Sequence, residues 1–251
     1  MTDLKITHVG GKETMIVLYD GLLDNHICET LLGVLKSDYP KNSFEGLMAS
    51  GFMPNVKLSS DLHFSALKYK EKDADFTDVH FDLEQSIHQA MSSCLAHYMS
   101  EYEVQTRMFD DINDTGFQVQ KYIRNYGYFR THVDSFPGQS VNNRVISVLL
   151  YLNTIEHGGE TNFPLHNQEV KPIAGRIVLF PATFTHPHES RPALSEDKWI
   201  INTFITNTVS QIDNPSIDVI ASFNNEVHDH IHDEEDELSH SHDNTTYIDE
   251  F

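Results

Sequence analysis

The sequence has little cysteine, and the spacing of what it has argues against a cross-linked or cysteine-ligated fold. Cys28 and Cys94 are its two cysteines, and they form no CxxC pair. Neither a disulfide framework nor a cysteine zinc site is indicated by this number and spacing. Both thiols are therefore expected to be reduced and packed in the interior.

Long apolar runs are lacking as well. No run approaches the length of about 18 residues that a membrane-spanning helix needs. The first six residues, Met1 to Ile6, contain no apolar core of signal-peptide length. We therefore expect a cytoplasmic protein with no membrane partner.

Positive charge is scarce. Seventeen lysines and arginines stand against thirty-eight aspartates and glutamates, which gives a formal net charge of -21. Such a field repels the phosphates of nucleic acids and anionic lipids, so no nucleic-acid partner is expected. It could favour a basic peptide or protein, but a soluble surface with an acidic tail is the preferred explanation of the charge.

The 251 residues suffice for one barrel or sandwich domain with additions, or for two small domains. Residues 16–20 predict a strand, and Asp24 can cap a helix over residues 25–36. Residues 40–77 show no sustained period and predict irregular structure with at most one strand. Apolar positions from 78 to 102 recur every three or four residues, which predicts a long amphipathic helix packed on the outside of a sheet.

From residue 117 to 205 the sequence changes to short β-branched and aromatic runs separated by glycine, proline and asparagine. This texture favours an antiparallel all-β core. The run from Val145 to Leu152 is almost continuously apolar, as expected for a central strand covered on both faces. The predicted fold class is α+β, a double-sheet barrel flanked by the earlier helices. The predicted strands are Gln118 to Ile123, Val145 to Leu152, Ile177 to Phe180 and Trp199 to Ile205.

The C-terminal part has a different composition. After about Ser210 apolar residues become sparse, and from His228 onward histidine, aspartate and glutamate dominate. Such a segment buries too little apolar area to offset the entropy of ordering, so residues 209–251 are predicted to be a disordered acidic tail. Metal binding by the tail histidines is the alternative interpretation.

The triplet His132-Val133-Asp134 is the first candidate for a chemical site. On a strand, residues i and i+2 point to the same face, so this imidazole and carboxylate would converge inside the barrel. A second triplet, His80-Phe81-Asp82, lies in the predicted helix, where positions i and i+2 diverge by about 200°. We therefore interpret the copy at 80–82 as a chance match.

A metal site needs a third ligand from a distant strand. Two histidines and one carboxylate on one face, with the remaining positions open, are typical of non-haem iron oxygenases. The candidates are His186 and His188, which share strand parity, so pattern alone does not choose between them. A structural, half-buried imidazole is the alternative role for either one.

Further motifs surround these candidates. They are Tyr122, His132-x-Asp134, Arg144 with Tyr151-Leu152, Gly158-Gly159-Glu160-Thr161-Asn162-Phe163-Pro164, Gly175, and His188 with Lys198-Trp199. With this set, residues 118–205 resemble the catalytic domain of prolyl 4-hydroxylases and related 2-oxoglutarate/Fe(II)-dependent dioxygenases. The resemblance implies a double-stranded β-helix, a jelly-roll or cupin-like barrel. It selects His188 as the third metal ligand, because the family's histidine lies ten residues before its lysine, and His186 would make the interval twelve.

The resemblance also implies the cofactors and their contacts. His132, Asp134 and His188 would hold Fe(II), and Lys198 would bind the 5-carboxylate of 2-oxoglutarate. Tyr151 and Tyr122 would be further cosubstrate contacts, although a barrel-core role explains each of them as well. Arg144 would line the substrate side, and its alternative is a surface strand position.

The implied reaction hydroxylates a substrate carbon with O2 and releases succinate and CO2, with ascorbate as the reductant. A prolyl residue of a peptide or protein is the expected substrate, and a free amino acid or other small molecule is the alternative. A non-catalytic metal-binding barrel is the alternative from another class of protein. Two positions depart from the family: Tyr122 lies ten rather than nine residues before His132, and Phe204 stands where a tryptophan is common.

These readings divide the chain into three parts. Residues 1–115 are expected to form an N-terminal strand and helix region that packs on the barrel. Residues 116–208 are expected to be the catalytic domain, and residues 209–251 the acidic tail.

Overall fold

The computed structural model describes residues 4–47, 51–64, 78–109, 111–135 and 143–207. The described residues all belong to one compact unit of the chain. The predictions for the acidic tail fall outside the described residues. Within the described ranges, no helix is both long and apolar enough to cross a membrane.

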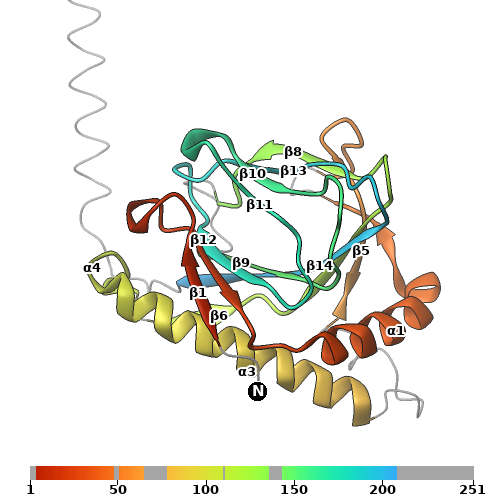
Figure 1. The fold of residues 1–251 in the computed structure, drawn as a ribbon, viewed down its shortest axis with the longest axis horizontal. Helices are drawn as coiled ribbons and strands as arrows, with labels where there is room; N and C mark the ends of the chain where they lie inside the picture. The colour runs from red at the N-terminus through yellow and green to blue at the C-terminus, as the bar shows by residue number, and fades with distance from the viewer. Residues whose placement is uncertain (1–3, 48–50, 65–77, 110, 136–142, 208–251) are drawn as a thin grey trace, which may run out of the picture. The chain divides into compact units, whose positions relative to one another are not determined.

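Two antiparallel sheets face each other and form the barrel (Figure 1). The large sheet has the strand order β1-β2-β12-β9-β14-β7-β5-β3, with β6 paired to β14, and the small sheet has the order β11-β10-β13-β8-β4. This arrangement confirms the predicted α+β fold with a double-stranded β-helix. The large-sheet strands are β1 (Lys5–His8), β2 (Val17–Asp20), β3 (Phe44–Glu45), β5 (Ser60–His63), β6 (Ile112–Asp114), β7 (Gln118–Tyr122), β9 (Arg144–Tyr151), β12 (Ile177–Pro181) and β14 (Lys198–Asn207), and the small-sheet strands are β4 (Lys57–Leu58), β8 (Tyr128–His132), β10 (Thr161–Phe163), β11 (Gln168–Val170) and β13 (His188–Ser190).

The predicted strand and helix near the N-terminus are confirmed. Helix α1 (Asn25–Asn42) follows β2, and Asp24 caps it, since its Oδ1 accepts a hydrogen bond from the backbone nitrogen of Ile27 at 2.8 Å. The helix ends at Asn42, beyond the predicted end at Lys36.

The long amphipathic helix is confirmed as α3 (Asp78–Glu101), which is followed by the short α4 (Glu103–Thr106). Ile87, Met91 and Tyr98 are buried in one core with apolar residues of α1 and the large sheet. Figure 1 shows α1 and α3 lying along the outer side of this sheet. The helices therefore cover the large sheet and leave the barrel interior free for a site.

The expectation of at most one strand in residues 40–77 is wrong for the part that the structure describes. Three short strands, β3, β4 and β5, lie there. They are two to four residues long, too short for a period to show in the sequence. Their partners lie far along the chain, β5 against β7 and β4 against β8, so tertiary pairing rather than local pattern creates them.

Strand β9 is the central strand that the apolar run predicted. It pairs with β12 on one side and β14 on the other. Ile146, Val148 and Leu150 belong to the core shared with the helices, whereas Leu149 and Tyr151 belong to the core inside the barrel. Both faces of β9 are therefore buried, and alternate residues serve two different cores.

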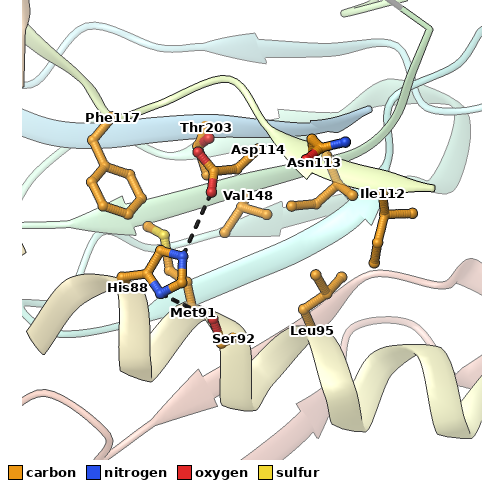
Figure 2. A pocket seen from close by; sticks show the side chains of 11 residues that line it. His88, Met91, Ser92, Leu95, Ile112, Asn113, Asp114, Phe117, Val148 and Thr203 are labelled. Carbon is orange, nitrogen blue, oxygen red and sulfur yellow. Dashed lines mark hydrogen bonds and ion pairs between the residues drawn. The ribbon is translucent and has the colours of Figure 1, made fainter. Parts of the chain in front are cut away.

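A cavity of about 290 Å³ lies on the helix side of these strands (Figure 2). Met91 and Leu95 of α3, Val148 of β9 and Thr203 of β14 are among the residues that line it. The neighbours of Val148 and Thr203 along their strands face the barrel interior instead. This cavity and the barrel interior thus lie on opposite faces of the same strands.

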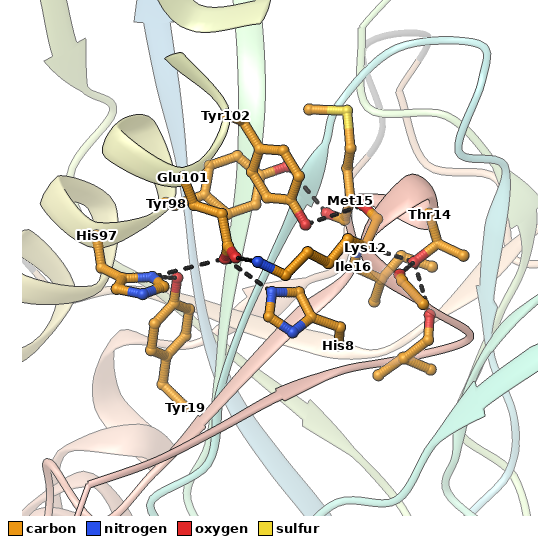
Figure 3. Close-up of polar contacts among 12 residues, drawn as sticks. His8, Lys12, Thr14, Met15, Ile16, Tyr19, His97, Tyr98, Glu101 and Tyr102 are labelled. Carbon is orange, nitrogen blue, oxygen red and sulfur yellow. Dashed lines mark hydrogen bonds and ion pairs between the residues drawn. The ribbon is translucent and has the colours of Figure 1, made fainter. Parts of the chain in front are cut away.

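A polar cluster joins the N-terminal strand to the end of α3 (Figure 3). The Glu101 carboxylate contacts Lys12 Nζ at 2.6 Å and His8 Nε2 at 2.7 Å. The ammonium of Lys12, together with His8, lowers the pKa of Glu101 from its usual value against a smaller opposing effect of burial. Beside it, the Tyr19 hydroxyl lies 3.0 Å from His97 Nδ1. The cluster fastens the edge of the large sheet to the helix that covers it.

Both cysteines are free and buried, as expected. Burial raises the pKa of the Cys28 thiol to about 11 and that of Cys94 to about 12. Protonated thiols in an apolar core are poor nucleophiles, so they act here as packing groups.

Candidate metal centre and cosubstrate pocket

Three side chains that could hold a metal converge inside the barrel. His132 is the last residue of β8, Asp134 follows two residues later, and His188 opens β13 directly opposite His132. Asp134 Oδ1 lies 3.4 Å from His132 Nε2, and Asp134 Oδ2 lies 3.5 Å from His188 Nε2. Within the described part of the chain, no other group of three histidine, cysteine or acidic residues gathers in this way.

Both imidazoles present the nitrogen that a metal would need. His132 Nδ1 donates to the backbone oxygen of Arg130 at 2.8 Å, and His188 Nδ1 donates to that of His186 at 3.0 Å. Each Nε2 therefore carries the lone pair and faces Asp134. Burial, helped by the neighbouring His132, lowers the pKa of His188 to about 4, so its ring is neutral at pH 7.

The carboxylate between them is held ionised. Burial alone would raise the pKa of Asp134, but His188, His132 and the Ser147 hydroxyl together hold it well below its usual range. Ser147 on β9 donates to Asp134 Oδ2 at 2.6 Å. Two imidazoles that turn Nε2 toward one ionised carboxylate form the donor set that suits Fe(II), so the residues present fit a non-haem iron.

The two predicted candidates for the third ligand lie in different surroundings. His186 is outside β13, in the turn before it, and its Nε2 lies 2.6 Å from the backbone oxygen of Thr14. Its Nδ1 lies 2.9 Å from the Thr185 hydroxyl. Both ring nitrogens are therefore engaged away from Asp134, and the structure brings only His188 to the carboxylate.

The second triplet lies where it was predicted. His80 and Asp82 are in the first turns of α3, and the ring of His80 stacks on Phe64 with centroids 6.3 Å apart. His80 thus packs between the helix and the sheet, away from the barrel interior.

Lys198 lies at the start of β14 and is only 1% exposed. Its Nζ donates to the Gly159 backbone oxygen at 2.8 Å and to the Ser190 hydroxyl, and it lies 4.8 Å from the centre of the Tyr122 ring. Burial lowers the pKa of this ammonium to about 7, although Glu160 opposes the shift. A lysine so placed lacks a full counter-charge and favours an anion beside it.

The two predicted tyrosines differ in their contacts. Tyr122 lines the cavity that contains the three converging side chains, and its hydroxyl donates to Gln120 Oε1 at 2.7 Å. Tyr151 is fully buried, with its hydroxyl 2.6 Å from Thr161 Oγ1. Burial raises the pKa of both phenols, that of Tyr151 to about 12, so both hydroxyls are neutral.

Arg144 is the first residue of β9. Its guanidinium stacks 3.8 Å from the centre of the Phe204 ring, and its Nη1 donates to the Asp134 backbone oxygen at 3.3 Å. Phe204, which stands where a tryptophan is common in the family, thus offers a flat aromatic face to the Arg144 cation beside the site.

The sequence reading missed several polar residues of this cavity, which has a volume of about 50 Å³. Asn202 is the most informative, because its Oδ1 is the one buried side-chain oxygen or nitrogen without a hydrogen-bond partner in the described part of the chain. Strand parity could have found it: Ile200, Asn202 and Phe204 follow Lys198 at steps of two, so they share its face. Gln120, Thr161 and Ser190 also line the cavity.

Fold and site together define a double-stranded β-helix with a two-histidine, one-carboxylate centre. Residues 117–206 match the family model of the 2OG-Fe(II) oxygenase superfamily. This match and the curated relatives below agree with the resemblance seen in the sequence: residues 117–206 are similar to prolyl 4-hydroxylases and other 2OG-Fe(II) oxygenases.

Two curated relatives match the chain in sequence. Prolyl 4-hydroxylase 13 of Arabidopsis thaliana is 27% identical over 54% of this chain and 58% of its own length. A putative prolyl 4-hydroxylase of Acanthamoeba polyphaga mimivirus is 34% identical over 38% of this chain and 45% of its own length. This chain thus spans about half the length of the curated relatives that it matches.

Solved structures share the fold. The viral collagen prolyl hydroxylase of Paramecium bursaria Chlorella virus-1, in its 2OG complex, aligns with a TM-score of 0.55 and 19% identity over 78% of this chain and 98% of that one. A prolyl hydroxylase of Trichoplax adhaerens, bound to a peptide fragment of the hypoxia inducible factor oxygen degradation domain, gives a TM-score of 0.59 and 20% identity over 78% and 85%.

Proposed function

We propose that this protein is a 2-oxoglutarate- and Fe(II)-dependent dioxygenase that hydroxylates a prolyl residue of a peptide or protein. The main support is that three residues suited to bind Fe(II) and one buried lysine all face the interior of the same barrel. His132, Asp134 and His188 would hold the metal, and Lys198 would bind the distal carboxylate of the cosubstrate. With both bound, the centre would supply oxidation of a substrate C–H bond by O2, coupled to conversion of 2-oxoglutarate to succinate and CO2.

The residues of the barrel would supply binding and orientation. The rings of His132 and His188 turn Nε2 toward the site, and Ser147 keeps Asp134 turned toward them. At the Lys198 end of the pocket, an ion pair with the distal carboxylate of 2-oxoglutarate would stabilise the ammonium form of Lys198, which burial disfavours. The neutral phenols of Tyr122 and Tyr151 would complete the walls near that end.

The peptide substrate is proposed from the relatives. The matching curated proteins are named prolyl 4-hydroxylases, and the Trichoplax neighbour was solved with a peptide. Arg144, stacked on Phe204 and bonded to the Asp134 backbone, would contact the substrate. Ascorbate would serve as the reductant.

The experiment is measurement of succinate from 2-oxoglutarate with Fe(II), ascorbate and O2, with and without proline-rich peptides. The proposal expects turnover that rises when peptide is added, together with a mass gain of one oxygen on proline. The His132→Ala protein is the control. Turnover stimulated by free amino acids but not by peptides would assign a small-molecule substrate, and absence of any turnover would favour a non-catalytic barrel.

A further inference from the structure

The His132 imidazole lies flat against the ring of Phe129. Their centroids are 3.4 Å apart and the rings are inclined by 12°. Residues three apart on a regular strand face opposite sides, so this stack needs an irregularity in β8. The pairing register of β8 and β13 shows this irregularity. His188 pairs with His132 and Ser190 pairs with Phe129, so a step of two residues along β13 matches a step of three along β8. A bulge thus turns Phe129 to the face of the metal-ligand candidate.

A buried cation lies over the same ring. Lys57, the residue paired with Phe129 across β4 and β8, has its Nζ 5.3 Å from the ring centre and is 3% exposed. Its ammonium forms an ion pair at 2.7 Å with Asp61, which is fully buried. Both charges are therefore fixed in place rather than solvated.

The ion pair joins the two sheets at the side of the site. Lys57 belongs to β4 of the small sheet and Asp61 to β5 of the large sheet. Ser59 and Gln118 also donate to the Asp61 carboxylate, at 2.7 and 3.0 Å. Every charge of this pair is satisfied, so the pair forms a rigid support for the ring above it.

We propose that Phe129, held by the Lys57–Asp61 ion pair, is a positioning residue that keeps the His132 imidazole in its metal-binding orientation. The hydrogen bond from Nδ1 to Arg130 limits ring rotation from one side, and the stack limits tilting out of the plane. Fixing a ligand before binding removes part of the entropy cost of binding. The inference rests on the proposed metal role of His132. It adds Lys57 and Asp61, which would act on the metal site only through Phe129.

The chain offers a matched control on the outer face of the barrel. Lys121 forms an ion pair with Asp197 at 3.0 Å, and its Nζ lies 5.2 Å from the centre of the Trp199 ring. This repeats the carboxylate, ammonium and aromatic ring of the first arrangement. Trp199 belongs to the core shared with the helices, away from the three metal-ligand candidates. Loss of the Lys121 charge should therefore affect stability without affecting metal binding.

The test is titration of the full chain with Mn(II), without cosubstrate, alongside the absorption spectrum of the Co(II)-loaded protein and thermal unfolding. We expect Phe129→Leu to weaken Mn(II) binding by about three- to tenfold, the value of an aromatic contact. The double variant Lys57→Met, Asp61→Leu replaces the pair by apolar groups and so leaves no buried single charge. It should weaken Mn(II) binding by about two- to fivefold and alter the Co(II) spectrum, whereas Lys121→Met should change neither.

Wild-type Mn(II) affinity in both Phe129→Leu and the double variant would overturn the inference. An equal loss in Lys121→Met would do the same, because it would show a general effect of stability. A protein whose Mn(II) affinity depends on Phe129 but which turns over no 2-oxoglutarate supports the inference and contradicts the proposed function. Absence of Mn(II) binding to the wild type would overturn both.

Discussion

Ser147 and Asp134 are joined by a hydrogen bond of 2.6 Å from the serine hydroxyl to the carboxylate Oδ2. The bond reaches from the central strand of the large sheet to the residue that follows β8. It leaves Asp134 Oδ1 and Oδ2 directed at His132 and His188, at 3.4 and 3.5 Å. The orientation of the candidate metal carboxylate thus depends on a residue that would not itself bind metal.

Ser147→Ala should therefore weaken metal binding without unfolding the protein. Loss of a partner that orients a metal ligand costs about ten- to a hundredfold in affinity. Titration with Mn(II) measures the change, and Ser93→Ala is the control, since Ser93 is exposed and its hydroxyl donates to the Gln89 backbone oxygen of the same helix. Equal affinities in the two variants would show that the bond does not orient Asp134.

Mutations in the two His-x-Asp triplets should have different effects on turnover of 2-oxoglutarate. His132→Ala or Asp134→Ala is expected to abolish Fe(II)-dependent turnover of 2-oxoglutarate, because each removes one of three convergent ligands. His80→Ala should keep nearly full turnover per folded molecule, because His80 packs against Phe64. Succinate release, normalised to folded protein by circular dichroism, decides it. A dead His80 variant beside an active His132 variant would reverse the assignment of the site.

The two neighbouring histidines should also differ. His188→Ala should lose tight iron binding and succinate formation together. His186→Ala should retain iron and lose about 1–3 kcal/mol of unfolding free energy, because its ring nitrogens contact the Thr14 backbone and Thr185 in a buried setting. Iron stoichiometry and urea unfolding of both variants test this. Iron lost from the His186 variant and kept by the His188 variant would be incompatible with the proposed ligand set.

Lys198→Ala should bind metal normally and require much more 2-oxoglutarate. A charge-assisted contact is worth about 1.5 to 3 kcal/mol, or roughly ten- to a hundredfold in affinity. The measurement is a 2-oxoglutarate titration of the metal-loaded protein, with Lys121→Ala as the control on the outer face of the barrel. Unchanged cosubstrate affinity would remove Lys198 from the proposed pocket.

The pKa of Lys198, lowered by burial to about 7, predicts a pH dependence of cosubstrate binding. An anionic ligand prefers the ammonium form, which is complete below pH 7 and is lost as the pH rises through that value in the free protein. Affinity for 2-oxoglutarate should therefore be constant at low pH and fall above about pH 7. Calorimetric titrations from pH 6 to 9 measure it, and an affinity independent of pH across this range would contradict the cation contact.

Strand and helix periods were sufficient to predict much of the fold. The alternating and continuous apolar runs predicted β7, β9, β12 and β14, and the three-to-four period predicted α3. These signals are local, since each element buries a face that its own residues define. The short strands β4 and β5 carry no such signal, because they exist through pairing with β8 and β7.

The sequence by itself determined the residue types of the site and, through strand parity and the family spacing, which histidines and lysine to consider. The tertiary structure decided what surrounds them. It separated His186 from His188, because the first lies in a turn against Thr14 and the second begins a strand opposite His132. It also brought Ser147, Phe129 and Lys57 to the candidate ligands, since contacts between sheets depend on a register and a bulge that no local pattern records.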